Sequence, residues 1–85
     1  MQIQLRFFAS VREKLGIGQE SLPLPPGVDT AGAVLALLRA RGGVWAEVLA
    51  EGRALRMAYD QEMTEPGQLL AEGGELAFFP PVTGG

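Results

Sequence analysis

Residues 75–85 of the chain read ELAFFPPVTGG, which combines a strand with the point where that strand leaves its sheet. The hydrophobic run from Glu75 to Phe79 predicts a final β-strand. Pro80 and Pro81 lack a backbone N–H, so strand pairing should stop there. Consecutive prolines also favour an extended polyproline conformation. The remaining residues are therefore expected to lead away from the folded domain.

The opening of the chain predicts another strand. Over residues 2–8, the apolar residues Ile3, Leu5 and Phe7 alternate with polar ones, which is the pattern of a strand with one buried face. Successive side chains of a strand point to opposite faces, so Phe8 falls on the outer face in this register.

The last strand carries an outward-facing aromatic residue in the same way. If Leu76 and Phe78 point inward, Phe79 points outward. Phe8 and Phe79 each stand at the carboxyl end of a strand, so parallel pairing of the two strands would join both rings in one exposed patch. Grouped aromatic side chains on a surface are typical of protein interfaces. The alternative is that a loop or helix covers them.

The best-defined helix is predicted in the middle of the sequence. Asp29 or Thr30 is a suitable N-cap, because its side-chain oxygen can accept a hydrogen bond from a free backbone N–H. Arg39 and Arg41 would occupy the last turn, where positive charge suits the helix dipole, and Gly42-Gly43 would end the helix. Its apolar face, with three- and four-residue spacing, comprises Ala31, Val34, Leu35 and Leu38.

Shorter elements fill the rest of the chain. Strands are predicted over residues 19–24 and 54–59, and helical turns over residues 11–15 and 44–51. A loop around Pro66-Gly67 and a turn at Gly73-Gly74 complete the pattern. Strands at both ends around one main helix indicate a single α+β domain with helices on one face of its sheet.

Composition excludes several classes of protein. The 85 residues suffice for one domain, and a net charge of −3 with scattered basic residues argues against nucleic-acid binding. The chain has no cysteine and no histidine, which excludes disulfides, thiolate metal sites and Ser-His catalysis. No apolar run could span a bilayer, and the start lacks the features of a signal peptide. We therefore expect no membrane contact and a cytoplasmic location.

An acidic stretch is the one place where the domain itself could hold a metal ion or an acid–base pair. Asp60, Glu62 and Glu65 lie close together in the sequence. Exposed loops often carry such residues without any chemical role, so the preferred interpretation is a solvated acidic loop.

The two last glycines are the strongest candidates for chemistry. The Gly-Gly pairs at 42–43 and 73–74 fall between elements, whereas Gly84-Gly85 precedes none. A tail without Cβ atoms can enter a narrow channel, and its terminal carboxylate is sterically free to attack a nucleotide phosphate. We expect a domain over residues 1–80 and a flexible tail over residues 81–85, which could reach roughly 16 Å at about 3.3 Å per residue. A frayed terminus without function is the alternative.

Both ends of the sequence resemble a known family. The ending LAFFPPVTGG at 76–85 and the opening FFASVRE at 7–13 are similar to those of the MoaD family, the small sulfur-carrier subunits of molybdopterin synthase. Length and element order agree across the whole chain. The resemblance implies a ubiquitin-like β-grasp fold, which is a mixed sheet with one main helix packed on one face and with the first and last strands adjacent and parallel.

The resemblance also implies a reaction at the terminal carboxylate. In this family an E1-like (MoeB-like) adenylyltransferase uses ATP and Mg²⁺ to convert the carboxylate, here that of Gly85, into an acyl-adenylate. A sulfur donor such as a cysteine desulfurase or a rhodanese then yields a thiocarboxylate. The tail enters the active site of the large, MoaE-like subunit, and its sulfur passes to cyclic pyranopterin monophosphate in molybdenum cofactor biosynthesis.

The carrier would accordingly be no enzyme on its own. The resemblance places the catalytic groups on the large subunit, leaves the carrier without a stably bound cofactor, and suggests a heterotetramer with two large subunits at its centre.

Contact residues are implied by the same resemblance. The positions of this sequence that match the family's contact residues imply an apolar docking surface of Phe8, Met63 and Phe79, with Arg12 as a polar contact nearby. For Met63 the alternative is packing on its own domain. The segment that would enter the partner comprises Pro80, Pro81, Val82, Thr83 and Gly84, which precede the reactive Gly85.

Two places depart from the family pattern. Residues 59–62 stand where a Val-Asn-Gln-like stretch is usual, and Gly74 replaces a usual Asp in the turn before the last strand. Neither departure touches the tail.

Three other functions stay open at this point. A carrier of the same fold could serve thiamine synthesis or tRNA thiolation, although the Phe-Phe-Pro-Pro motif favours molybdopterin. A ubiquitin-like modifier would be joined through Gly85 to lysines of other proteins. A passive interaction domain would not use its terminal glycine at all.

Overall fold

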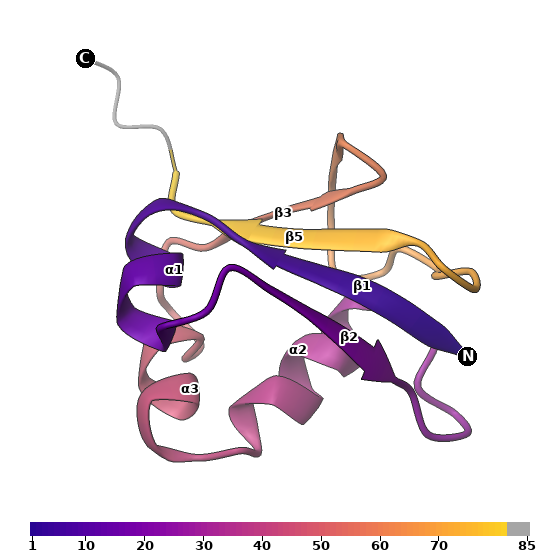
Figure 1. Cartoon of the computed structure of the whole chain (residues 1–85), viewed down its shortest axis with the longest axis horizontal. Helices are drawn as coiled ribbons and strands as arrows, with labels where there is room; N and C mark the ends of the chain where they lie inside the picture. Colours follow the sequence, from indigo (N-terminus) through magenta and orange to yellow (C-terminus); the bar gives the residue numbers. More distant parts are fainter. Residues whose placement is uncertain (82–85) are drawn as a thin grey trace.

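The computed structural model describes residues 1–81, which form a five-stranded mixed sheet with helices packed on one face (Figure 1). The strands lie in the order β2-β1-β5-β3-β4. This arrangement confirms the expected α+β, ubiquitin-like β-grasp fold. The strands are β1 (Gln2–Phe7), β2 (Gln19–Pro23), β3 (Arg56–Tyr59), β4 (Glu62–Thr64) and β5 (Glu75–Phe79), and the helices are α1 (Ala9–Leu15), α2 (Ala31–Arg39) and α3 (Gly43–Val48).

The first and last strands lie side by side and run parallel, as expected. β1 pairs with β5 through Leu5↔Leu76 and Phe7↔Phe78, and β2 and β3 flank this pair in antiparallel pairings. All four of these side chains are at most 1% exposed, because each points toward the helices. The rings of Phe7 and Phe78 stack with their centroids 6.0 Å apart, and the edge contact of Phe7 with Trp45 extends the core to α3.

Helix α2 covers the buried face of the sheet. It begins at the N-cap Thr30, whose Oγ1 accepts a hydrogen bond of 3.1 Å from the backbone N–H of Ala33. The predicted apolar face is buried. The predicted end at Gly42-Gly43 is wrong, because α2 ends at Arg39 and Gly42 is the N-cap of α3, with a φ of 76° that suits glycine.

Arg41 consequently lies beyond the last turn of α2. Its guanidinium donates hydrogen bonds to the carboxylate of Glu20 on the edge strand β2, and its Cζ stands 4.4 Å from the ring centroid of Trp45. The hydrogen bond to Glu20 raises the pKa of Arg41 above its ordinary value. These contacts tie the α2–α3 connection to the edge of the sheet.

The predicted acidic loop contains a strand that the sequence pattern did not indicate. β4 pairs antiparallel with β3 through Ala58↔Met63. Asp60 and Gln61 form the turn between the two strands, with φ values of 47° and 70°. Such left-handed values at both central residues are those of tight β-hairpin turns.

The two departures from the family pattern lie in contact with each other. The hydroxyl of Tyr59 accepts a hydrogen bond of 2.8 Å from the backbone N–H of Ala71, which places the tyrosine ring across the turn before β5. A Cβ atom at Gly74 would come within 2.6 Å of ring atom Cε1 of Tyr59. The glycine therefore leaves the space that the tyrosine occupies.

None of the helices between residues 1 and 81 has the length and apolar character that crossing a bilayer requires.

The contact between Gly74 and Tyr59 predicts coupled effects on stability. Gly74→Ala should lower the free energy of unfolding by about 1–3 kcal/mol, because the added methyl group overpacks the turn. In a Tyr59→Val background the same change should cost clearly less, because the smaller side chain removes the overlap. Urea denaturation of both single variants and the double variant measures the coupling.

Gly67→Ala is the matched control. No atom lies within 4 Å of a Cβ at Gly67, so the expected change is at most about 0.5 kcal/mol. If the losses in free energy of unfolding caused by the changes at positions 59 and 74 were strictly additive, the proposed contact would be contradicted.

Candidate functional site

The side chains that point away from the helices form a row across four strands of the sheet. In register, Arg6 of β1 lies beside Ala77 of β5 and Ala77 lies beside Ala58 of β3. Met63 of β4 continues the row next to Ala58. Two methyl groups at the centre fill little volume, so this face of the sheet has a shallow middle between larger side chains.

Phe8 and Phe79 line one hollow of about 350 Å³ on this face. Phe8 is 40% exposed and Phe79 is half-buried. The backbone N–H of Phe8 donates to the carbonyl of Phe78 over 3.1 Å, which continues the β1–β5 pairing one residue beyond β1 and places Phe8 and Phe79 on the same hollow. The parallel pairing of β1 and β5 that the patch requires is present, and the binding of a partner at this patch stays a prediction. The hollow is completed by Arg6, Ala58, Gln61, Glu75 and Ala77.

Arg6 brings a positive charge to the hollow. Its guanidinium lies 3.4 Å from a carboxylate oxygen of Glu75 and 5.5 Å from the centroid of the Phe8 ring. Its Nε is buried and has no acceptor among residues 1–81. A buried N–H without an acceptor costs about 1–3 kcal/mol, so a partner that supplied an oxygen here would gain binding energy.

The other two contact residues expected in the domain lie outside this hollow. Met63 is 63% exposed and shares the face by its register, but it does not line the hollow. This exposure contradicts the alternative that Met63 packs on its own domain. Arg12 is exposed on α1, with its guanidinium against Gly18 in the loop before β2. The structure thus places Phe8 and Phe79 on one hollow and leaves the side chain of Arg12 outside it.

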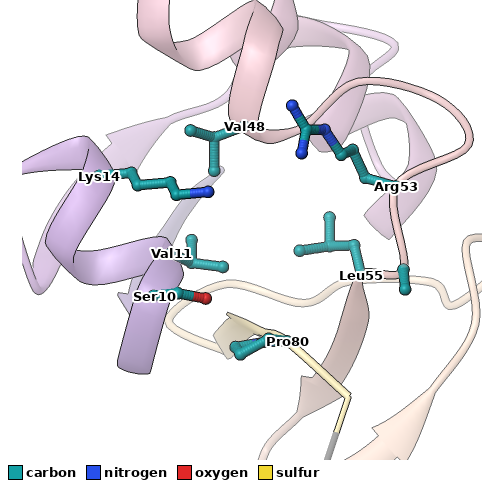
Figure 2. Close-up of a pocket in the computed structure, with 8 residues that line it drawn as sticks. Ser10, Val11, Lys14, Val48, Arg53, Leu55 and Pro80 are labelled. Carbon is teal, nitrogen blue, oxygen red and sulfur yellow. The ribbon is translucent and has the colours of Figure 1, made fainter.

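The root of the tail lies at the same end of the sheet. β5 ends at Phe79, as the prolines predicted. Pro80 is half-buried and lines a second hollow, of about 160 Å³, between α1 and the segment before β3 (Figure 2). Pro81 is the last described residue. The predicted reactive and channel-entering residues Val82, Thr83, Gly84 and Gly85 lie outside the described residues.

The acidic stretch has a structural role in the hairpin. Asp60 accepts a hydrogen bond of 2.9 Å from the backbone N–H of Glu75 through its Oδ1, and its own N–H donates to the carbonyl of Glu75. Within residues 1–81 no group of three or more potential metal ligands occurs. Asp60 therefore joins β5 to the β3–β4 turn.

Sequence reasoning missed Arg6, Ala58 and Ala77 as parts of the open face. The alanines carry no chemical signal, and their importance comes from register alone. The alternation in β1 did place Arg6 on the outer face, and this was the available signal for it.

Comparison with known sequences identifies the family. A family model described as the ThiS family matches residues 5–85. The molybdopterin synthase sulfur carrier subunit of Haemophilus influenzae is 37% identical to this chain over 83 residues, which cover 98% of this chain and 99% of that protein.

Two solved structures share the fold. SAMP1 from Haloferax volcanii has a TM-score of 0.76 at 26% identity, and the match covers 100% of both chains. A chain in the complex of subunits 1 and 2 of the molybdopterin-converting factor from Helicobacter pylori has a TM-score of 0.70 at 20% identity, again with 100% coverage of both chains. The second likeness concerns the fold alone.

The family match spans all but the first few residues, and the Haemophilus relative is similar along its full length. The chain therefore belongs to the ThiS family.

Proposed function

We propose that this protein is the sulfur carrier subunit of a molybdopterin synthase. One observation carries the proposal: parallel pairing of β1 and β5 brings the aromatic hollow of Phe8 and Phe79 to the end of the sheet where the chain leaves toward Gly84-Gly85. A docking surface beside the root of a thin tail is what a carrier needs. The name of the Haemophilus relative supports this function.

The proposed chemistry takes place at the carboxylate of Gly85. An oxygen of the carboxylate attacks the α-phosphate of ATP on an E1-like activating partner, pyrophosphate leaves, and an acyl-adenylate forms. The outer sulfur of a persulfide on a cysteine desulfurase or rhodanese then displaces AMP and forms an acyl disulfide with the donor's cysteine. A thiol reductant attacks the cysteine sulfur of this S–S bond, forms a disulfide with it and releases the thiocarboxylate. Adenylation is needed because a carboxylate is a poor electrophile. ATP and Mg²⁺ belong to the activating enzyme.

The carrier's own part is binding and delivery. In our proposal, the open face with Phe8, Met63 and Phe79 docks on the partner, and residues 80–85 deliver the terminal sulfur to the partner's active site. Aromatic side chains of this kind supply much of the energy of protein interfaces. The catalytic groups that transfer sulfur to cyclic pyranopterin monophosphate would lie on the large subunit.

The large, MoaE-like subunit is the proposed partner for this step. A chain of the same fold is found with a second subunit in the Helicobacter pylori complex, which supports the pairing by analogy of fold. The heterotetramer, the activating enzyme and the cytoplasmic location stay predictions.

A ubiquitin-like modifier is the second candidate. It is favoured by the similarity to SAMP1, a small archaeal modifier protein, at 26% identity over the full chain. Intact-mass analysis separates the two functions. A carrier acquires sulfur in place of oxygen at its terminus, whereas a modifier appears as adducts that leave a branched Gly-Gly on lysines after proteolysis.

Deletion of Gly85 should abolish sulfur loading while leaving the fold intact. The core is built within residues 3–78, so the thermal unfolding midpoint should equal that of the complete chain. The measurement is the intact mass after incubation with the activating enzyme, ATP, Mg²⁺ and a sulfur donor. Synthase activity retained by the truncated chain would exclude the proposed reaction.

Phe79→Asp should weaken binding to the large subunit more than it weakens folding. We expect the Kd to rise at least about tenfold, because an aromatic contact is replaced by a charge, while the free energy of unfolding falls by about 1 kcal/mol. Titration calorimetry and urea denaturation measure the two quantities.

The neighbouring Phe78 gives the matched control for this experiment. Phe78 is fully buried on the opposite face, so Phe78→Ala should cost about 3–5 kcal/mol of stability. If Phe79→Asp lost as much stability as Phe78→Ala, Phe79 would be a core residue and not a docking residue.

A further inference from the structure

Positive charges without an acidic partner gather at the root of the tail. Within residues 1–81, the side chains of Arg6, Arg39 and Arg41 form ion pairs. The four other cationic side chains of this region form none: they are those of Arg12, Lys14, Arg53 and Arg56. The distribution is unexpected for a chain whose net charge is −3.

Three of these four charges lie close to the point where the tail begins. Lys14 and Arg53 line the second hollow together with Pro80. Arg56 is the strand partner of Phe79, the residue that precedes Pro80. An acidic protein thus presents a local positive surface around the start of its tail.

The hollow that Pro80 lines has an apolar floor and a cationic rim. Figure 2 shows Lys14 reaching from α1 on one side and Arg53 on the other, with Val48 between them and the Ser10 hydroxyl directed into the space. The floor is formed by Val11, Leu55 and Pro80. At about 160 Å³ the hollow suits one side chain and not a nucleotide.

From this arrangement we propose that the tail-root hollow binds an acidic side chain at the rim of the channel into which the partner protein admits the tail. The inference rests on the proposed carrier function. Charge complementarity identifies the occupant, because two cations that form no ion pair within residues 1–81, together with a hydroxyl, select a carboxylate, and the apolar floor selects a protein segment over a free anion. Two cations are too few for binding nucleic acid.

The length of the tail separates this contact from the reaction itself. Residues 81–85 can span roughly 16 Å at about 3.3 Å per residue. The hollow therefore contacts the entrance of the channel, while Gly85 reacts deeper in the partner. The contact would hold the tail in line with the channel, and it would add to the docking of the open face.

The test measures the Kd with which the variant Lys14→Gln/Arg53→Gln binds the purified large subunit from the same organism. At low ionic strength its Kd should be about tenfold higher than that of the unmodified chain, as expected for the loss of two exposed charge pairs. The difference should shrink at high salt, because salt screens exposed charges. The control Ala36→Glu/Ala71→Glu changes the net charge equally at exposed positions away from the hollow and should bind normally.

The only lysine of the chain makes a direct test possible. Lys14 is that lysine, so a carbodiimide, which joins an amine to a carboxylate in contact with it, should link Lys14 to an acidic residue of the large subunit. Peptide mapping distinguishes this product from any link through Met1, which lies at the opposite end of the domain (Figure 1). Lys14→Arg keeps the charge and should keep the affinity while losing the crosslink.

The outcomes separate this inference from the proposed function. If the unmodified chain binds the large subunit and acquires sulfur, while Lys14→Gln/Arg53→Gln binds equally well and Lys14 forms no crosslink, the inference alone is wrong. If the unmodified chain acquires no sulfur, the proposed function is wrong, and a crosslink at Lys14 would still support the contact. If the unmodified chain does not bind the large subunit at all, both are wrong.

Discussion

The parallel pairing of β1 with β5 is the constraint on which the rest of the structure depends. Two parallel neighbours cannot be joined by a hairpin, so the chain between them must cross from one end of the sheet to the other. Helix α2 packs on the sheet within this long connection and buries its apolar face there. Parallel direction also means that both strands finish at the same end, and this places Phe8, Phe79 and Pro80 together.

This end of the domain presents two different surfaces on either side of β5. The aromatic hollow lies on the open face, where Phe8 and Phe79 flank a floor of alanines. The cationic hollow lies on the helical side, between α1 and the segment before β3. A partner that receives residues 81–85 would meet both surfaces around the start of the tail. Apolar contact would supply affinity, and charge would orient the approach, since charged rims act mainly on encounter and alignment.

Periodicity predicted the elements whose spacing directly reflects burial. The alternation of Ile3, Leu5 and Phe7 and the helical spacing in α2 arise because one side of each element faces the core. Strand β4 was not predicted because its three residues are too few to show an alternation. The end of α2 was misplaced because Gly42 serves the start of α3 instead. The alanine floor depends on strand register, and the cationic hollow depends on packing between distant segments, so neither leaves a local signal in the sequence.

In the proposed function, a carrier whose terminal carboxylate is activated also benefits from having few nucleophiles of its own. An acyl-adenylate reacts with amines and thiols, and a self-reaction would consume the end that must accept sulfur. The chain has no cysteine, and its seven basic residues comprise six arginines and a single lysine. A guanidinium keeps its positive charge and does not act as a nucleophile at neutral pH, so arginine supplies charge without this risk. The one side-chain amine, Lys14, stands beside Pro80 at the start of the tail. In the inferred contact, an ion pair with a partner's carboxylate would occupy that amine while the tail is engaged, so the same contact that aligns the tail would also keep the amine away from the activated end.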